Sequence, residues 1–171
     1  MKKDEQDAKD QAELQMGLIM DAVNRIDHLR ECDVVDCDLT SEEIYNGLGY
    51  TGVALHCSYV DGLNPSAEEI EDYHDEDLAI TSLLELALEV TVRSGWVPPL
   101  VHVDLEVAEY QILLCTGGPA VRVIGAVGSD GYPLTARLEY QDWFIAWTEY
   151  PADSAERDAL LKFAGWFSYE L

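Results

Sequence analysis

The chain has 171 residues and a formal net charge of −24, with 34 acidic residues against 10 lysines and arginines. This charge disfavours binding to nucleic-acid phosphates or anionic lipid, and it favours a basic protein surface as partner. Hydrophobic residues make up 48% of the chain, with four Trp and nine Tyr, which excludes a disordered acidic tail. The length suits a single folded domain over residues 1–171.

Residues 4–30 are predicted to form a long helix with an acidic outer face. Its apolar residues recur at three- and four-residue steps, as on the buried face of an amphipathic helix: Ala8, Ala12, Met16, Ile19, Val23 and Ile26.

Short elements are predicted after this helix. Residues 32–38 form a connector, and Thr40 with Glu43 makes a capping box for a short helix. Residues 53–60 are rich enough in β-formers for a strand.

A further helix is predicted to start with Pro65 in its first turn. It either runs unbroken to Arg93 or breaks around His74, with Asp75 capping a second segment. The prolines at positions 98 and 99 end it. Residues 1–100 are thus predicted to be mainly helical and acidic.

From Val101 onward, short β-rich runs predict an antiparallel four-stranded meander. The predicted strands are residues 107–115, 120–127, 134–140 and 144–150, separated by two glycine-containing turns and by a tight turn near Asp142. Asp153 or Ser154 is predicted to cap a closing helix that covers one sheet face. The predicted fold class is α+β, with acidic N-terminal helices packed against the meander and the closing helix.

The stretch from Glu68 to Asp77 has seven carboxylates in ten residues and no cation. If helical, it carries roughly one charge per 2 Å of axis, close to the roughly 1.7 Å per charge of duplex DNA. We predict that these acids, together with those of the first helix, bind a partner; the alternatives are a solvated surface or a calcium site. The predicted contact residues are Glu68, Glu69, Glu71, Asp72, Asp75, Glu76, Asp77, Asp4, Asp7, Asp10 and Glu13.

No metal site, cofactor or catalytic motif is predicted, so we do not expect an enzyme. One set of residues has zinc-binding chemistry but lacks a C-x-x-C knuckle: His28, Cys32, Cys37, His56 and Cys57. Cys115 lies among apolar strand residues, where burial is expected to raise its pKa. Gly117, Gly118 and Pro119 suit a hairpin turn better than a phosphate-binding loop.

The last predicted hairpin is rich in aromatic residues, which suit either the core or an exposed protein-binding patch. They are Tyr140, Trp143, Trp147 and Tyr150. The N-terminus lacks an apolar signal region and no apolar run reaches 18 residues, so we expect a cytoplasmic protein without a membrane span.

Two resemblances concern the two halves of the chain. The run from Thr116 to Ala120, followed by residues 138–143 and 147–150, resembles the C-terminal half of small uncharacterised proteins of bacteriophages and other mobile elements. This resemblance covers about the last 65 residues and implies a mobile-element origin. In charge character, the N-terminal part is similar to DNA-mimic proteins that act against restriction or CRISPR systems.

Together these observations predict a phage-type nucleic-acid mimic. It would occupy the basic nucleic-acid cleft of a host defence nuclease or CRISPR complex, without binding nucleic acid directly. The alternatives are an immunity protein that neutralises a basic toxin nuclease and a small metal-dependent protein that uses the His and Cys residues. The sequence does not indicate an oligomeric state.

Overall fold

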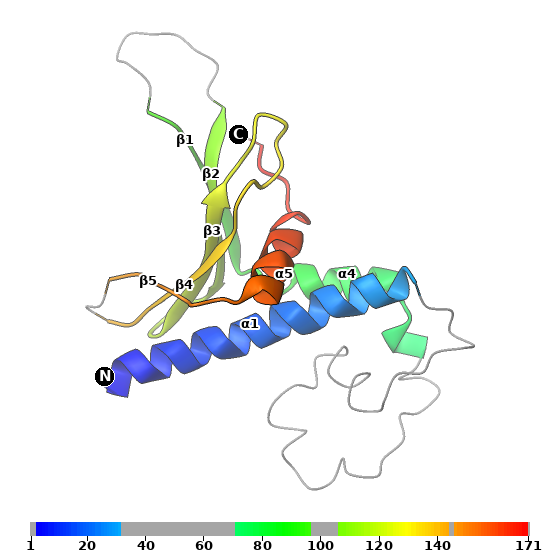
Figure 1. The fold of residues 1–171 in the computed structure, drawn as a ribbon, viewed down its shortest axis with the longest axis horizontal. Helices are drawn as coiled ribbons and strands as arrows, with labels where there is room; N and C mark the ends of the chain where they lie inside the picture. The colour runs from blue at the N-terminus through cyan, green and yellow to red at the C-terminus, as the bar shows by residue number, and fades with distance from the viewer. Residues whose placement is uncertain (1–2, 32–70, 97–105, 144–145, 171) are drawn as a thin grey trace, which may run out of the picture. The chain divides into compact units, whose positions relative to one another are not determined.

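The computed structural model describes residues 3–31, 71–96, 106–143 and 146–170 (Figure 1). The predicted connector at 32–38, the capping box at Thr40 and the strand at 53–60 lie outside these residues. The chain forms two compact units, one made of residues 1–16 and 87–171 and the other of residues 17–86. Each unit is described by itself.

Helix α1 (Lys3–Leu29) confirms the predicted N-terminal helix almost to the residue. All six residues of the apolar stripe are at most 4% exposed. Three of them, Ala8, Ala12 and Met16, belong to the first unit, and the other three belong to the second. The three- and four-residue spacing was therefore a reliable guide to the buried side of this helix.

The first unit contains a five-stranded antiparallel sheet in the order β1-β2-β3-β4-β5. Its strands are β1 (Glu89–Ser94), β2 (Val107–Cys115), β3 (Ala120–Ala126), β4 (Arg137–Gln141) and β5 (Thr148–Glu149). The α+β class is confirmed, and β2 has the predicted bounds. The predicted number of four strands is wrong, because β1 adds a fifth.

Strand β1 replaces the end of the helix that was predicted to reach Arg93. Helix α4 (Glu76–Leu84) ends before it, and the amide of Glu85 donates to the Thr81 and Leu83 carbonyls. Strand β1 then pairs with β2 along its whole length, from Glu89 opposite Leu113 to Ser94 opposite Val107. The run Val90-Thr91-Val92 consists of β-branched residues, which favour a strand once a partner strand is present.

The break near His74 is confirmed as the correct alternative for this segment. Residues 71–73 form a helical turn, and α4 begins at Glu76. Asp75 caps α4, because its side chain accepts a hydrogen bond of 2.9 Å from the Leu78 amide. The acidic stretch is therefore not one straight helix, and the regular charge spacing calculated from the sequence does not apply to all of it.

One face of the sheet is apolar and covered. Tyr110, Ile112 and Leu114 alternate along β2 with less buried residues. Helix α5 (Ser154–Ala164) contributes buried Leu160 and Phe163 to this unit and lies against β4 (Figure 1).

The chain after α5 also contacts the covered face, since the rings of Tyr110 and Tyr169 are 4.6 Å apart. Asp153 and Glu156 form a capping box at the start of α5, as predicted for Asp153. The opposite face of the sheet is left to carry polar groups.

Among the described residues, no helix combines the length and apolar character that crossing a bilayer requires.

Candidate functional site

The acidic segment, defined here as residues 71–77, belongs to the second unit, and its carboxylates are exposed. Five of the seven predicted carboxylates are described, and all five are exposed: Glu71, Asp72, Asp75, Glu76 and Asp77. None of them forms an ion pair with any described residue, and Asp75 alone has a local structural task as the cap of α4. Glu68 and Glu69 lie outside the described residues.

The backbone of the acidic segment is held by a buried arginine. Arg25, 2% exposed, donates from Nε to the Tyr73 carbonyl over 2.9 Å and from Nη2 to the Asp72 carbonyl. Its guanidinium also lies 5.3 Å from the centre of the Tyr73 ring. Burial lowers the pKa of Arg25, while Tyr73, Asp75 and Asp72 oppose that shift. Arg25 thus holds the acidic segment by the backbone carbonyls of the segment, and the carboxylates of the segment remain exposed.

The predicted acids of α1 belong to the other unit. Asp7, Asp10 and Glu13 are exposed, and Asp10 accepts a hydrogen bond from Gln6. Asp4 lies within α1.

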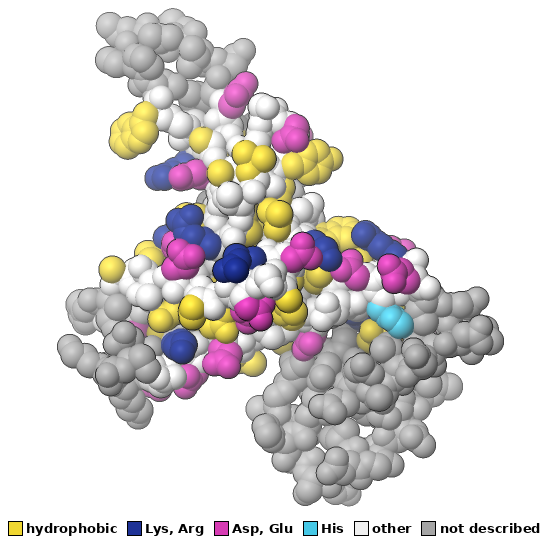
Figure 2. Space-filling model, viewed as in Figure 1, with side chains coloured by type: hydrophobic (Ala, Val, Ile, Leu, Met, Phe, Trp, Pro, Cys, Tyr) yellow, Lys and Arg dark blue, Asp and Glu magenta, His cyan; other side chains and the backbone are white. Residues whose placement is uncertain are grey.

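A second polar surface, not anticipated from the sequence, is the open face of the sheet, opposite the covered face. Its middle row crosses four strands as Thr91, Gln111, Ile124 and Arg137, which are successive register partners. The rows on either side contain two cross-strand pairs, Arg93 with Glu109 and Arg122 with Glu139. On the face seen in Figure 2, basic side chains lie beside acidic ones in the described part of the chain.

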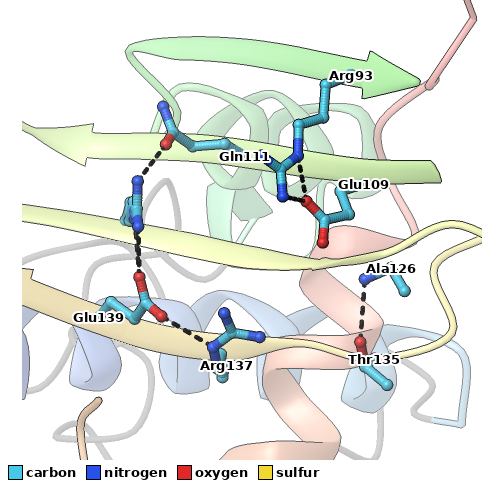
Figure 3. A network of polar contacts seen from close by, with 8 residues as sticks. Arg93, Glu109, Gln111, Ala126, Thr135, Arg137 and Glu139 are labelled. Atoms are coloured by element: carbon cyan, nitrogen blue, oxygen red, sulfur yellow. Dashed lines mark hydrogen bonds and ion pairs between the residues drawn. The ribbon is translucent and has the colours of Figure 1, made fainter. Parts of the chain in front are cut away.

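Glu139 is the centre of the polar network on this face (Figure 3). Its Oε2 accepts hydrogen bonds from Nε and Nη2 of Arg122, at 2.9 and 2.7 Å, and its Oε1 accepts one of 2.8 Å from Nε of Arg137. Nη1 of Arg122 donates to Gln111 over 2.7 Å. The Trp147 ring covers Arg122, with its centre 4.0 Å from the guanidinium carbon. One carboxylate is therefore shared by two arginines.

The pKa of Glu139 is lowered by this arrangement. Burial alone would raise it, since the side chain is only 11% exposed. The hydrogen bonds and charges of Arg122 and Arg137 overcome that effect and keep the carboxylate ionised. By contrast, the pair between Arg93 and Glu109 is exposed, at 72% and 40% for the two side chains.

Above the middle row lies a hollow of about 370 Å³. Its lining includes Arg93, Arg122 and Arg137, with Glu109 as an acidic member and Ile124 as an apolar one. The sequence offered one signal for this site. Arg122 and Arg137 are the only cations in the strands expected after Val101, and each lies between apolar neighbours that face the other side of the sheet.

The aromatic residues of the last hairpin divide between the two expected roles. Tyr140 is 8% exposed and belongs to the core, whereas Trp143 is 69% exposed. Trp147 and Tyr150 are half-buried. The predicted hairpin turn between β2 and β3 is confirmed, with Gly117 at a φ of 124° that favours glycine.

Cys115 lies at the end of β2, and burial raises its pKa, as predicted, against hydrogen bonds from Val121 and Gln11. We expect iodoacetamide at pH 8 to alkylate Cys115 at least about threefold more slowly in the native protein than in urea, because less thiolate is present and access is reduced. Mass spectrometry of the peptide containing Cys115 measures both rates. Equal rates would show that this thiol is neither buried nor shifted.

The zinc-type set contains one described residue, His28, because Cys32, Cys37, His56 and Cys57 lie outside the described ranges. Within those ranges no three His, Cys, Asp or Glu side chains gather in a way that would hold a metal ion.

Comparisons with protein families, with curated proteins and with solved structures gave no match.

Proposed function

We propose that this protein acts by binding a basic protein surface through its acidic segment. The supporting observation is that five neighbouring carboxylates are exposed and form no ion pair with any described residue. Repulsion among these neighbouring carboxylates destabilises the compact state. Their presence is therefore better explained by a cationic partner than by a contribution to folding. Asp7, Asp10 and Glu13 of α1 are further exposed carboxylates, and they belong to the other unit.

In its finer form, the proposal is that the partner surface is a nucleic-acid cleft of a host defence nuclease or CRISPR complex. The protein then inhibits by occupying lysines and arginines that otherwise hold phosphates, and it needs no catalysis. Because the segment is broken at His74 and Asp75, the mimicry rests on the density of unpaired charge. It does not require the even spacing of a phosphate backbone.

The test is a fourfold neutralisation that keeps side-chain shape: Glu71→Gln, Asp72→Asn, Glu76→Gln and Asp77→Asn. Asp75 is retained because it caps α4. Exposed ion pairs contribute about 0.2–1 kcal/mol each, so we expect partner affinity to fall about 10-fold or more. Binding to the partner captured by the wild type from bacterial extract is measured at low and high salt, with and without duplex DNA as competitor.

The matched control neutralises four exposed acids elsewhere: Glu106→Gln, Glu149→Gln, Asp158→Asn and Glu170→Gln. Both variants have the same net charge, so a loss confined to the first identifies the contact. If the two variants bind like wild type, with the same salt dependence, the acidic segment is only a solvated surface. Equal losses in both would indicate a general charge effect instead.

A further inference from the structure

The hollow on the open sheet face reverses the charge of the protein locally. Three of the ten basic residues of the chain, Arg93, Arg122 and Arg137, line it. The lining contains one carboxylate, Glu109, and Glu139 pairs with Arg122 and Arg137 beside it. Counting both carboxylates leaves a surplus of one positive charge in a protein of net charge −24. The large negative net charge already keeps such a chain soluble. Solubility therefore does not explain why three guanidinium groups gather at this hollow.

Several donors around the hollow remain unused by the described residues. Arg137 donates only from Nε, to Glu139, so both of its terminal nitrogens are available. Gln111 accepts from Arg122 through Oε1, which leaves its amide group as a donor. The Thr91 hydroxyl lies in the same row. The site therefore presents donors from three strands, and both oxygens of Glu139 are already engaged.

The spacing of the strands determines the size of the ligand that these donors can contact. Neighbouring strands are about 4.8 Å apart, so the row from Thr91 to Arg137 spans about 14 Å between its outer strands. The lining of the hollow includes the apolar residue Ile124, which lies in this row beside Arg137. A volume of about 370 Å³ lies within the range of small-molecule sites.

We propose that this hollow binds the phosphate group of a small phosphorylated molecule, held by the terminal nitrogens of Arg137 and by the side-chain amide of Gln111, with the remainder of the molecule extending toward Thr91. A phosphate offers three oxygens in different directions, enough for the two terminal nitrogens of Arg137 and the Gln111 amide, whereas a carboxylate offers two oxygens in one plane. Glu109 is tied to Arg93 at the other side of the rim and disfavours an anion there, so the phosphate lies toward Arg137. The apolar residue Ile124 accommodates the remainder of the molecule.

The test is a titration of the ¹⁵N-labelled full chain followed by NMR, at pH 7.5 and constant ionic strength. The probes are inorganic phosphate, glucose 6-phosphate and adenosine monophosphate, with acetate as the carboxylate comparison. We expect saturable shifts of the Gln111 side-chain amide and the Arg137 Nε–H group with phosphate compounds, and much weaker ones with acetate. Tighter binding of either ester than of inorganic phosphate identifies a phosphorylated metabolite as the source; tighter binding of inorganic phosphate identifies the free ion.

Arg137→Gln is expected to weaken phosphate binding at least 10-fold. Arg157→Gln is the control, because it removes the same charge from an exposed position on α5 outside the hollow, and it should leave the affinity unchanged. Thr91→Val gives a second test that leaves Glu139 and its arginines untouched. It should weaken binding of the two esters a few fold and leave inorganic phosphate unaffected, because Thr91 lies at the end of the row toward which the remainder of the molecule extends. The proposal is overturned if no phosphate compound gives saturable shifts, if acetate binds as tightly, or if Arg157→Gln weakens binding as much as Arg137→Gln.

Discussion

Replacing Gly125 by alanine is expected to lower the free energy of unfolding by about 3 kcal/mol or more, because overpacking against backbone leaves little room for adjustment. A Cβ atom on this residue of β3 would lie 1.8 Å from the Thr135 carbonyl oxygen and 2.7 Å from the Tyr110 hydroxyl. These two groups are hydrogen-bonded to each other over 2.8 Å. The added methyl group therefore has to push apart a backbone segment and the hydrogen bond that holds it.

Urea denaturation of wild type and Gly125→Ala measures this effect. Gly17→Ala is the matched control, because Gly17 is exposed within α1 and a Cβ there meets no atom within 4 Å. Alanine is favoured over glycine inside a helix, so the control should be more stable than wild type by about 0.5–1 kcal/mol. A Gly125→Ala protein as stable as wild type would mean that the segment around Thr135 does not lie over β3.

Replacing Glu139 by glutamine is expected to lower the free energy of unfolding by about 2–3 kcal/mol at pH 7. The change removes the charge shared by Arg122 and Arg137, and the Arg122 side chain, 18% exposed, is left without a counter-ion. Breaking a buried pair by removing one partner is costly, although Gln111 and Trp147 still hold Arg122. Glu109→Gln is the control, and it should cost less than about 1 kcal/mol because that pair is exposed.

The loss should depend on pH in a defined direction. Because the folded-state pKa of Glu139 is below the ordinary value of 4.5, its ionised form stabilises the fold at pH values above 4.5. That stabilisation is lost as the pH falls through the lowered pKa and the wild-type carboxylate becomes protonated. Stability curves of wild type and Glu139→Gln, measured by urea denaturation between pH 7 and pH 3, should therefore converge at the acidic end. A constant gap over that range would contradict the assigned role of the charge.

The helices and the central strands could be predicted from the sequence because their determinants are local. The six apolar residues of α1 repeat within one or two turns, and Asp153 and Asp75 cap the helices that directly follow them. Strand β2 alternates buried and half-buried residues over nine positions. In each case the relevant neighbours are a few residues away, so the pattern indicates both the element and its buried side.

Strand β1 and the arginine network depended on contacts that no local pattern contains. The residues of β1 also fit the end of a helix, and they form a strand only because they pair with β2 residues that lie 13 to 24 positions away in the chain. Likewise, Arg122 and Glu139 become partners because β3 and β4 pair in one register, and a shift by one residue would turn them to opposite faces. The sequence by itself thus determined the helical and acidic character of the N-terminal part and the order of most elements. The tertiary structure alone decided which charges lie together on the open face, because strand register places side chains that are distant in the chain next to one another.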